Sequence, residues 1–225
     1  MQASDRLIVA ADLSSRDEIL ALADEMSGIA GVLKIGLQAF VANGPSLVRE
    51  VVGRGVKIFL DLKLHDIPNT VQQAIREVEK LGVTMVTVHA SGGGRMLRAA
   101  VSEKLLVLGV TVLTSLDDEA IREVGFAGDV MSVVPRLARL AQQSGLRGVV
   151  ASPLEIRAIR EVCGEALTIV APGVRPAGSD RGDQARTLTP REAIAAGADY
   201  VVIGRPITEK KNRREAAVRI IEEMV

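Results

Sequence analysis

The side chains best suited to chemistry are concentrated in one segment, Asp61-Leu62-Lys63-Leu64-His65-Asp66. A carboxylate beside a lysine offsets the cost of burying either group. An alternation of Asp and Lys also keeps a lysine protonated and oriented, as a general acid requires. The segment therefore indicates proton donation from Lys63, supported by Asp61. The alternative is an ion pair that only attaches this segment to its neighbours.

Strand geometry predicts which charged side chains meet. Successive residues of a strand face opposite sides, so Phe59, Asp61 and Lys63 share one face and the intervening aliphatic residues share the other. The same count places Asp12 and Lys34 late in two earlier apolar runs, on the corresponding face. The aliphatic faces must pack on helices. We therefore expect four charged groups, Asp12, Lys34, Asp61 and Lys63, to converge at adjacent strand ends.

A second group of residues has the character of a phosphate site: Gly173, Arg175, Gln184, Gly204 and Arg205. Glycine backbone N–H groups and basic side chains bind phosphate after the last two strands of many barrels. The run Val202-Ile203-Gly204-Arg205 leads a strand directly into such a site. The alternative is a glycine turn followed by a surface arginine.

The elements that must position these groups alternate regularly. Apolar β-rich runs predict strands at 6–12, 32–37, 56–63, 83–90, 105–114, 147–151, 167–171 and 199–204. Helical periodicity follows each run, at 15–27, 44–53, 69–81, 93–101, 129–144, 153–163, 189–196 and 211–225. Eight such repeats without a linker predict one α/β domain over residues 1–225, a (β/α)8 TIM barrel. Polar residues stand late in these apolar runs, so the functional site should lie at the carboxyl ends of the strands.

Composition excludes several functions. Lys plus Arg and Asp plus Glu both number 28, so no net charge favours nucleic acid or an anionic membrane. Three Phe, one Tyr and no Trp provide few platforms for stacking bases. One cysteine and an N-terminus without a signal-peptide pattern indicate a soluble, cytoplasmic protein.

Other conspicuous residues have structural interpretations. His89 has no second ligand at metal-binding spacing, so a packed histidine is favoured. Cys163 lies in an amphipathic segment and is expected in the core. The glycines after Ser91 favour a turn, and the basic run at 210–214 favours a solvated helix start.

The segment Asp61-Leu62-Lys63-Leu64-His65-Asp66-Ile67-Pro68-Asn69-Thr70 strongly resembles the orotidine 5′-phosphate decarboxylases. The resemblance extends along almost the whole chain, in the family's order. It includes Val9-Ala10-Ala11-Asp12, Leu33-Lys34-Ile35-Gly36, Val88-His89-Ala90-Ser91-Gly92-Gly93, Val112-Leu113-Thr114-Ser115, Ala171-Pro172-Gly173-Val174-Arg175, Gly182-Asp183-Gln184 and Val202-Ile203-Gly204-Arg205-Pro206.

The resemblance implies conversion of orotidine 5′-phosphate to UMP and carbon dioxide, without cofactor or metal. It implies a homodimer with the site at the interface and a catalytic array of Lys34, Asp61, Lys63 and Asp66. Asp66 would reach in from the partner subunit, with Ile67 and Thr70 beside it. Lys63 would protonate C6, and repulsion between Asp61 and the substrate carboxylate would be relieved as carbon dioxide leaves.

The remaining substrate contacts follow by the same analogy. Asp12 and Lys34 would bind the ribose hydroxyls, and Thr114 or Ser115 the pyrimidine edge. Pro172 would also contact the substrate. The phosphate would be held by Arg175, Gln184, Gly204 and Arg205, with the loop 176–187 closing over it as a lid.

Three other classes of protein remain open. A magnesium-dependent sugar-phosphate decarboxylase or hexulose-phosphate synthase also carries an Asp-x-Lys-x-x-Asp strand. Such enzymes have a carboxylate where this chain has Lys34, which argues against them. A barrel that only binds a nucleotide or sugar phosphate would have no need of Lys63 as a buried proton donor. An isomerase barrel of amino-acid biosynthesis would share the phosphate end but not the segment that begins at Asp61.

Overall fold

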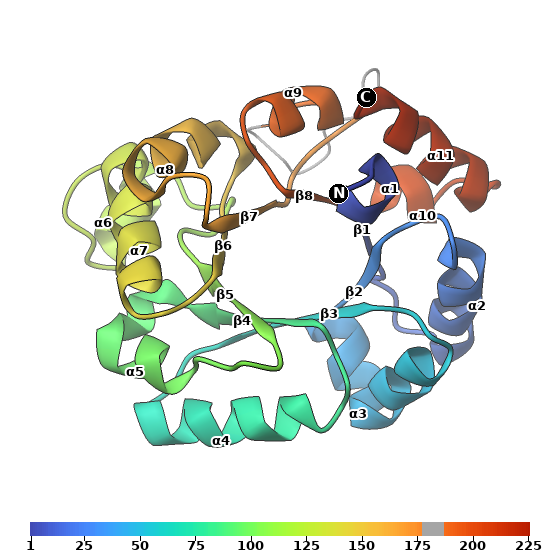
Figure 1. The fold of residues 1–225 in the computed structure, drawn as a ribbon, viewed down its shortest axis with the longest axis horizontal. Helices are drawn as coiled ribbons and strands as arrows, with labels where there is room; N and C mark the ends of the chain where they lie inside the picture. The colour runs from blue at the N-terminus through green and yellow to red at the C-terminus, as the bar shows by residue number, and fades with distance from the viewer. Residues whose placement is uncertain (177–186) are drawn as a thin grey trace.

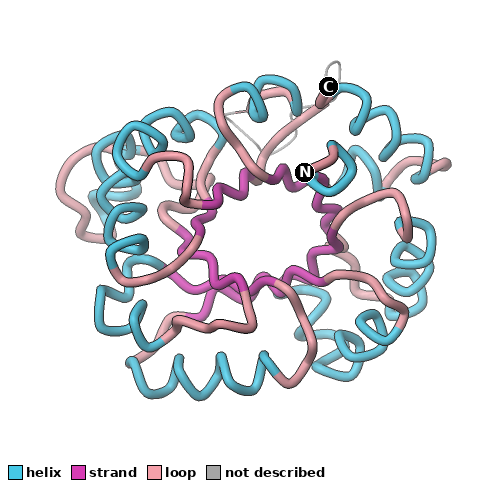
Figure 2. The backbone as a smooth tube through the Cα atoms, in the orientation of Figure 1, coloured by secondary structure: helices cyan, strands magenta, loops and turns pink. Residues whose placement is uncertain are grey.

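The protein is a closed barrel of eight parallel strands that pair in chain order, β1 to β8 (Figures 1 and 2). The computed structural model describes residues 1–176 and 187–225. The strands are β1 (Leu7–Ala10), β2 (Val32–Gly36), β3 (Ile58–Leu64), β4 (Met85–His89), β5 (Leu106–Val110), β6 (Gly148–Val150), β7 (Thr168–Ala171) and β8 (Tyr200–Ile203). The predicted (β/α)8 architecture is confirmed.

A layer of helices surrounds the barrel, as Figure 1 shows. The principal ones are α2 (Arg16–Met26), α3 (Leu37–Gly53), α4 (Pro68–Glu79), α5 (Gly93–Ala99), α7 (Val130–Gln143), α8 (Ile156–Cys163), α9 (Pro190–Ala195) and α11 (Arg213–Glu223). Each overlaps one of the eight predicted helices. Shorter pieces without a predicted counterpart are α1 (Ala3–Arg6), α6 (Asp118–Glu123), α10 (Arg205–Thr208) and the 3₁₀ turn η1 (Ala90–Gly92). Another 3₁₀ turn, η2 (Pro153–Glu155), leads into α8. Pieces this short complete too few turns for hydrophobic periodicity to reveal them.

Helix α3 begins earlier than the predicted start at residue 44. Its first part starts directly after β2, and a kink at Gly44, where φ is 68°, separates it from the second part. The next residue, Pro45, has no N–H to continue the helical hydrogen bonds, so the chain restarts there. The predicted helix is therefore the second part of α3.

Two apolar cores divide the strand residues by face. Ile58 and Leu60 of β3 are fully buried among the helices, whereas Phe59 joins a separate core inside the barrel. Ile8 and Ala10 of β1 belong to the same interior core. The predicted alternation is thus confirmed for these strands. It places the side chains that follow on the interior face at the mouth of the barrel.

Strand β5 is shorter than predicted. The apolar run continues to residue 114, but β5 pairs with β6 only as far as Val110 opposite Val150. The hydroxyl of Thr111 donates to the Val150 carbonyl at 3.0 Å, just beyond the last pair. Strand length here is set by the short partner β6. Thr114 and Ser115 therefore lie in a turn after the strand.

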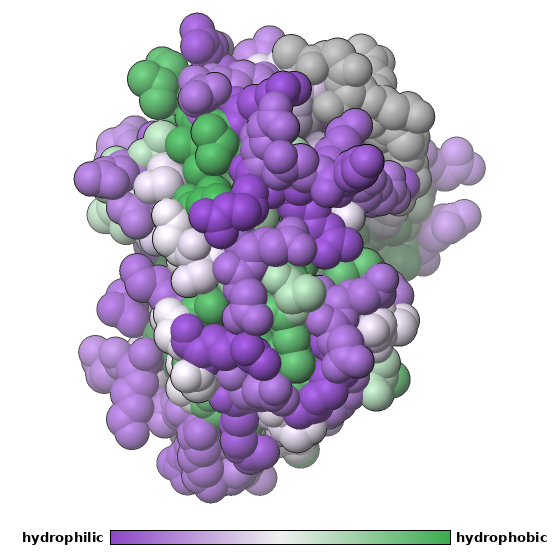
Figure 3. Space-filling model, turned by 90° about the vertical axis from the view of Figure 1, so that its right-hand side faces the viewer, coloured by the Kyte–Doolittle hydropathy of each residue, from purple (hydrophilic) through white to green (hydrophobic). Residues whose placement is uncertain are grey.

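The outer surface is mainly polar on the side shown in Figure 3, with apolar residues in smaller groups between hydrophilic ones. This is the pattern of amphipathic helices that bury one face against a barrel. Within the described ranges, every helix is too short or too polar to cross a bilayer.

Candidate active site

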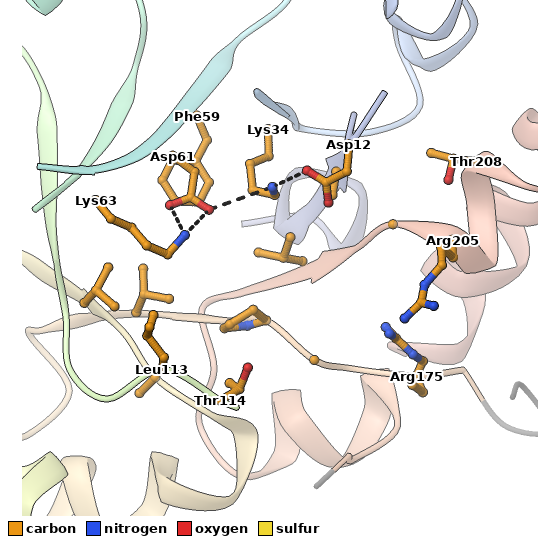
Figure 4. A pocket seen from close by; sticks show the side chains of 18 of the residues that line it. Asp12, Lys34, Phe59, Asp61, Lys63, Leu113, Thr114, Arg175, Arg205 and Thr208 are labelled. Carbon is orange, nitrogen blue, oxygen red and sulfur yellow. Dashed lines mark hydrogen bonds and ion pairs between the residues drawn. The ribbon is translucent and has the colours of Figure 1, made fainter. Parts of the chain in front are cut away.

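A cavity of ≈ 540 Å³ opens at the carboxyl ends of the strands (Figure 4). Its volume lies in the range of small-molecule sites. Ten of the residues proposed from the sequence line it: Asp12, Lys34, Asp61, Lys63, Thr114, Pro172, Gly173, Arg175, Gly204 and Arg205. The barrel thus brings together residues that lie up to 193 positions apart, from Asp12 to Arg205.

A continuous chain of charges occupies one side of the cavity. The Lys63 ammonium donates to both carboxylate oxygens of Asp61, at 2.9 Å each. The Lys34 ammonium lies 3.8 Å from Asp61 and 2.8 Å from Asp12, so it bridges the two carboxylates. Lys34 is only 8% exposed. Because each of these charges has an opposite charge beside it, two lysines can be accommodated at a partly buried site.

Gly36, at the end of β2, leaves room for this chain. A Cβ at residue 36 would stand 3.0 Å from both the Asp12 carboxylate and the Lys34 ammonium. Any side chain there would push against the bridge between them. The bridge thus supplies the reason for a glycine at this position.

The backbone of Lys63 has an unusual conformation. Its φ of 52° is the one positive value among the non-glycine residues that the structure describes. Such a conformation costs about 1–3 kcal/mol and persists only where its surroundings enforce it. It coincides with an irregularity in the pairing of β3 with β4, between Leu60 and Leu64. The proposed proton donor therefore sits at the most strained backbone position of its strand.

Two arginines face each other at the other side of the cavity. Arg175 follows β7 and Arg205 begins α10, and Figure 4 shows their guanidinium groups pointing toward one another. Burial, and then the Arg205 charge, lower the pKa of Arg175 below its ordinary value. An anion bound between the two groups would relieve this repulsion. The arrangement would suit an anionic group such as a phosphate.

Four proposed residues lie outside this cavity. Asp66, Ile67 and Thr70 are exposed beyond the end of β3, and Ser115 is exposed beyond β5. The Asp66 carboxylate accepts a hydrogen bond of 2.6 Å from the backbone N–H of Ile67. Gln184, and nearly all of the predicted lid at 176–187, lie outside the described residues.

Sequence reasoning assigned no role to several residues that line the cavity. The apolar floor comes from residues of the barrel interior and residues packed against them: Ala10, Phe59, Val110, Val150, Val202 and Leu113. The rim extends to Thr208, the last residue of α10, and to Glu209 beyond it. Strand alternation places Phe59 on the same face as Asp61 but gives it no role. No comparable signal exists for Thr208, because its place depends on how α10 packs.

His89, interpreted from the sequence as a packed histidine, ends β4 beside the cavity. Its ring lies 5.4 Å from that of His65. Burial, followed by the charges of His65 and Lys63, lowers the pKa of His89 below 6.5. The neutral imidazole is therefore favoured in the folded protein at neutral pH.

This shift predicts a pH dependence of stability. Below pH 6.5 the unfolded chain binds a proton at this histidine more readily than the folded chain does. The free energy of unfolding should therefore fall as pH drops from 6.5 toward the lowered pKa of His89. Urea unfolding at pH 7 and pH 5.5 measures this fall in the free energy of unfolding. The fall should be smaller for His89→Gln than for the unmodified chain. Equal losses would contradict the assignment.

Within residues 1–176 and 187–225, no three His, Cys, Asp or Glu side chains lie together as metal ligands do. Metal independence of the reaction remains a prediction.

Fold and site together define a (β/α)8-barrel protein with a Lys–Asp array facing an arginine pair. The sequence model of the orotidine 5′-phosphate decarboxylase / HUMPS family matches residues 5–220. The chain belongs to this family.

Relatives from several bacteria are similar over the full length. The orotidine 5′-phosphate decarboxylase of Moorella thermoacetica is 52% identical, covering 100% of this chain and 94% of its own. That of Paramagnetospirillum magneticum is 50% identical, covering 96% and 97%. Among solved structures, orotidine 5′-phosphate decarboxylase from Lactobacillus acidophilus superposes with a TM-score of 0.85 at 34% identity, covering 97% of this chain and 98% of its own.

Proposed function

We propose that this protein decarboxylates orotidine 5′-phosphate to UMP and carbon dioxide, in the cytoplasm. One observation carries the proposal: a single cavity holds a Lys–Asp–Lys–Asp chain on one side and two arginines on the other. Relatives that are 43–52% identical bear the name of this enzyme. The two ends of the cavity suit the two ends of a nucleotide.

The substrate would span the cavity from arginines to lysines. Its phosphate would lie between Arg175 and Arg205, where two positive groups already face each other. The ribose hydroxyls would bind Asp12 and Lys34, which join through a 2.8 Å ion pair. The pyrimidine would then lie against Lys63, with Thr114 at its edge and Pro172 nearby.

The reaction needs a cation and a proton at one carbon. When the bond from C6 to the carboxylate breaks, carbon dioxide leaves and the electron pair stays on C6, in the plane of the ring. The ring π system cannot delocalise that pair, so a nearby ammonium must stabilise it. Lys63 would supply this charge and then its proton, which gives UMP, and water would reprotonate the neutral amine.

Asp61 would have two roles in this step. Its carboxylate binds the Lys63 ammonium through both oxygens and so aims it at C6. It would also lie close to the substrate carboxylate, and the repulsion between them would vanish as carbon dioxide departs. An Asp61→Asn variant that binds UMP normally and keeps full turnover would exclude the second role.

We propose further that the active enzyme is a homodimer. Asp66 and Thr70 are exposed and lie outside the cavity of their own chain. Apolar side chains are exposed in the segments that follow β2 and β3: Ile67 is 65% exposed, and Leu37 and Val41, at the start of α3, are 52% and 80% exposed. These segments are neighbours at the same end of the barrel, because β2 and β3 pair in parallel. A second copy that covers them would bury this apolar surface.

Mixing two inactive variants tests the shared site. If Asp66 serves the partner's site, Asp66→Ala and Lys63→Ala should each be inactive alone. Random exchange of subunits makes half of the dimers mixed, and each mixed dimer has one intact site. Activity should then recover to about a quarter of the unmodified level. If Asp66 acted within its own chain, mixing would restore nothing.

The proposed function is tested by following the loss of orotidine 5′-phosphate absorbance in buffer with EDTA, and UMP by chromatography. Conversion that is insensitive to EDTA is expected. If magnesium is required, and a hexulose or gulonate phosphate is the substrate, the chain belongs with the metal-dependent enzymes. Binding of UMP without any turnover would leave a nucleotide-binding barrel.

A further inference from the structure

Strand β3 contains extra residues where it passes β4. Leu60 pairs with Val86, but the next pair is Leu64 with Val88. Three residues of β3, including Asp61 and Lys63, thus stand opposite the single residue Thr87. A bulge of this kind re-aims side chains and interrupts the backbone ladder. It leaves the Lys63 amide in need of a partner from outside the ladder.

The side chain of Thr87 provides that partner. Its hydroxyl oxygen accepts a 2.8 Å hydrogen bond from the backbone N–H of Lys63. The same hydroxyl lies 2.9 Å from Oδ1 of Asp61. The amide can only donate and an ionised carboxylate can only accept, so the hydroxyl proton points to Asp61. Thr87 is fully buried, so water does not compete for either bond.

We propose that Thr87 is the positioning residue of the Asp61–Lys63 pair, a role that rests on the proposed function. Through one hydroxyl it holds the left-handed backbone of Lys63 and one oxygen of its carboxylate partner. The ammonium of Lys63 bonds to the same oxygen, Oδ1, at 2.9 Å. Backbone, carboxylate and ammonium therefore form a closed loop of hydrogen bonds that passes through Thr87.

Loss of this hydroxyl should affect the chemical step more than substrate binding. Without it, Lys63 can relax from φ 52° toward an ordinary strand conformation, and its ammonium then moves relative to C6. A misplacement of about 1 Å can cost 10²-fold in rate. The groups proposed for phosphate and ribose, Arg205 and Asp12, follow β8 and β1, which do not pair with β4, so they should keep their places.

Two pairs of residues at position 87 isolate the hydroxyl. Thr and Val have the same shape, and Ser and Ala differ from each other by the hydroxyl alone. We expect Thr87→Val and Thr87→Ala to lower kcat by about 10²-fold with KM changed less than about threefold. Thr87→Ser should stay within about threefold of the unmodified kcat. If Thr87 serves only packing, Thr87→Ser should instead be impaired and Thr87→Val should not.

Thr84 supplies the matched control. It precedes β4 at the opposite end of the barrel, and its hydroxyl donates to the Ile58 carbonyl at 2.8 Å. Thr84→Val loses one hydroxyl hydrogen bond between the same two strands, away from the cavity. Its kcat and KM should match those of the unmodified chain.

Amide hydrogen exchange provides a readout that does not depend on turnover. The Lys63 amide should exchange at least about tenfold faster in Thr87→Val, because its acceptor is gone, and at the unmodified rate in Thr87→Ser and Thr84→Val. Full kcat in Thr87→Val, or an unchanged Lys63 exchange rate, would overturn the proposal. If the unmodified chain fails to convert orotidine 5′-phosphate, the proposed function fails instead, while the exchange rate still reports whether the hydroxyl holds the bulge.

Discussion

Replacement of Lys63 by alanine is expected to lower the rate of orotidine 5′-phosphate decarboxylation by about 10⁴-fold or more. The variant loses both the cation beside the carbanion and the proton that quenches it. Asp61 would remain without the ammonium that it now binds at 2.9 Å through both oxygens. Single-turnover absorbance measurements check the prediction, because they separate the chemical step from substrate binding.

Lys57 provides a matched control next to the same strand. It directly precedes β3, is exposed, and lies at the opposite end of the barrel from the cavity. Lys57→Ala should keep the kcat and KM of the unmodified chain. If the decarboxylation rate of Lys63→Ala fell by less than tenfold, Lys63 would not be the proton donor, whatever the effect of the substitution on stability.

Replacement of Arg205 by alanine is expected to lower kcat/KM by about 10²-fold or more. A charge-assisted hydrogen bond to the phosphate disappears, so KM should rise strongly. We also expect kcat to fall. Binding energy at the phosphate, remote from C6, can hold the charged array in its working geometry. Steady-state kinetics over a wide range of substrate concentration give the two parameters separately.

The division between kcat and KM decides what the phosphate contact does. A rise in KM alone would mean that the arginine binds substrate and transition state equally, and the remote effect on the array would be excluded. No change in either parameter would place the phosphate elsewhere. Arg219→Ala is the control: this arginine lies on α11 outside the cavity, with a side chain that is 75% exposed.

Much of the site was predictable from local pattern. Period-2 alternation put Asp61 and Lys63 on the face of Phe59, and the interior core contains Phe59 as that count requires. Asp12 and Lys34 followed from the same count, and they meet at 2.8 Å. These predictions hold because alternation is a property of the extended backbone and needs no knowledge of the neighbouring strands.

Other features depended on partners that the sequence does not specify locally. β5 ends at Val110 because β6 is short, although the apolar run continues beyond it. Thr87 was hidden in the apolar run of β4, and its contact with Lys63 arises only from the bulge against β3. The side-chain contacts of Asp66 in an assembly remain a prediction, since they depend on a second chain.

The sequence by itself thus determined the eight-fold alternation of strand and helix and the family to which the motifs belong. It also determined the strand face on which Asp12, Lys34, Asp61 and Lys63 lie. Periodicity and residue type can be recognised within a few consecutive positions. Each strand or helix can therefore be predicted from its own segment of the sequence. Only the tertiary structure decided that Lys63 takes a left-handed backbone and that Thr87 holds it there. It also decided that Arg175 and Arg205 lie together and face each other, on the side of the cavity opposite the lysines. Register and closure of the barrel set these distances, and both arise from the pairing of all eight strands.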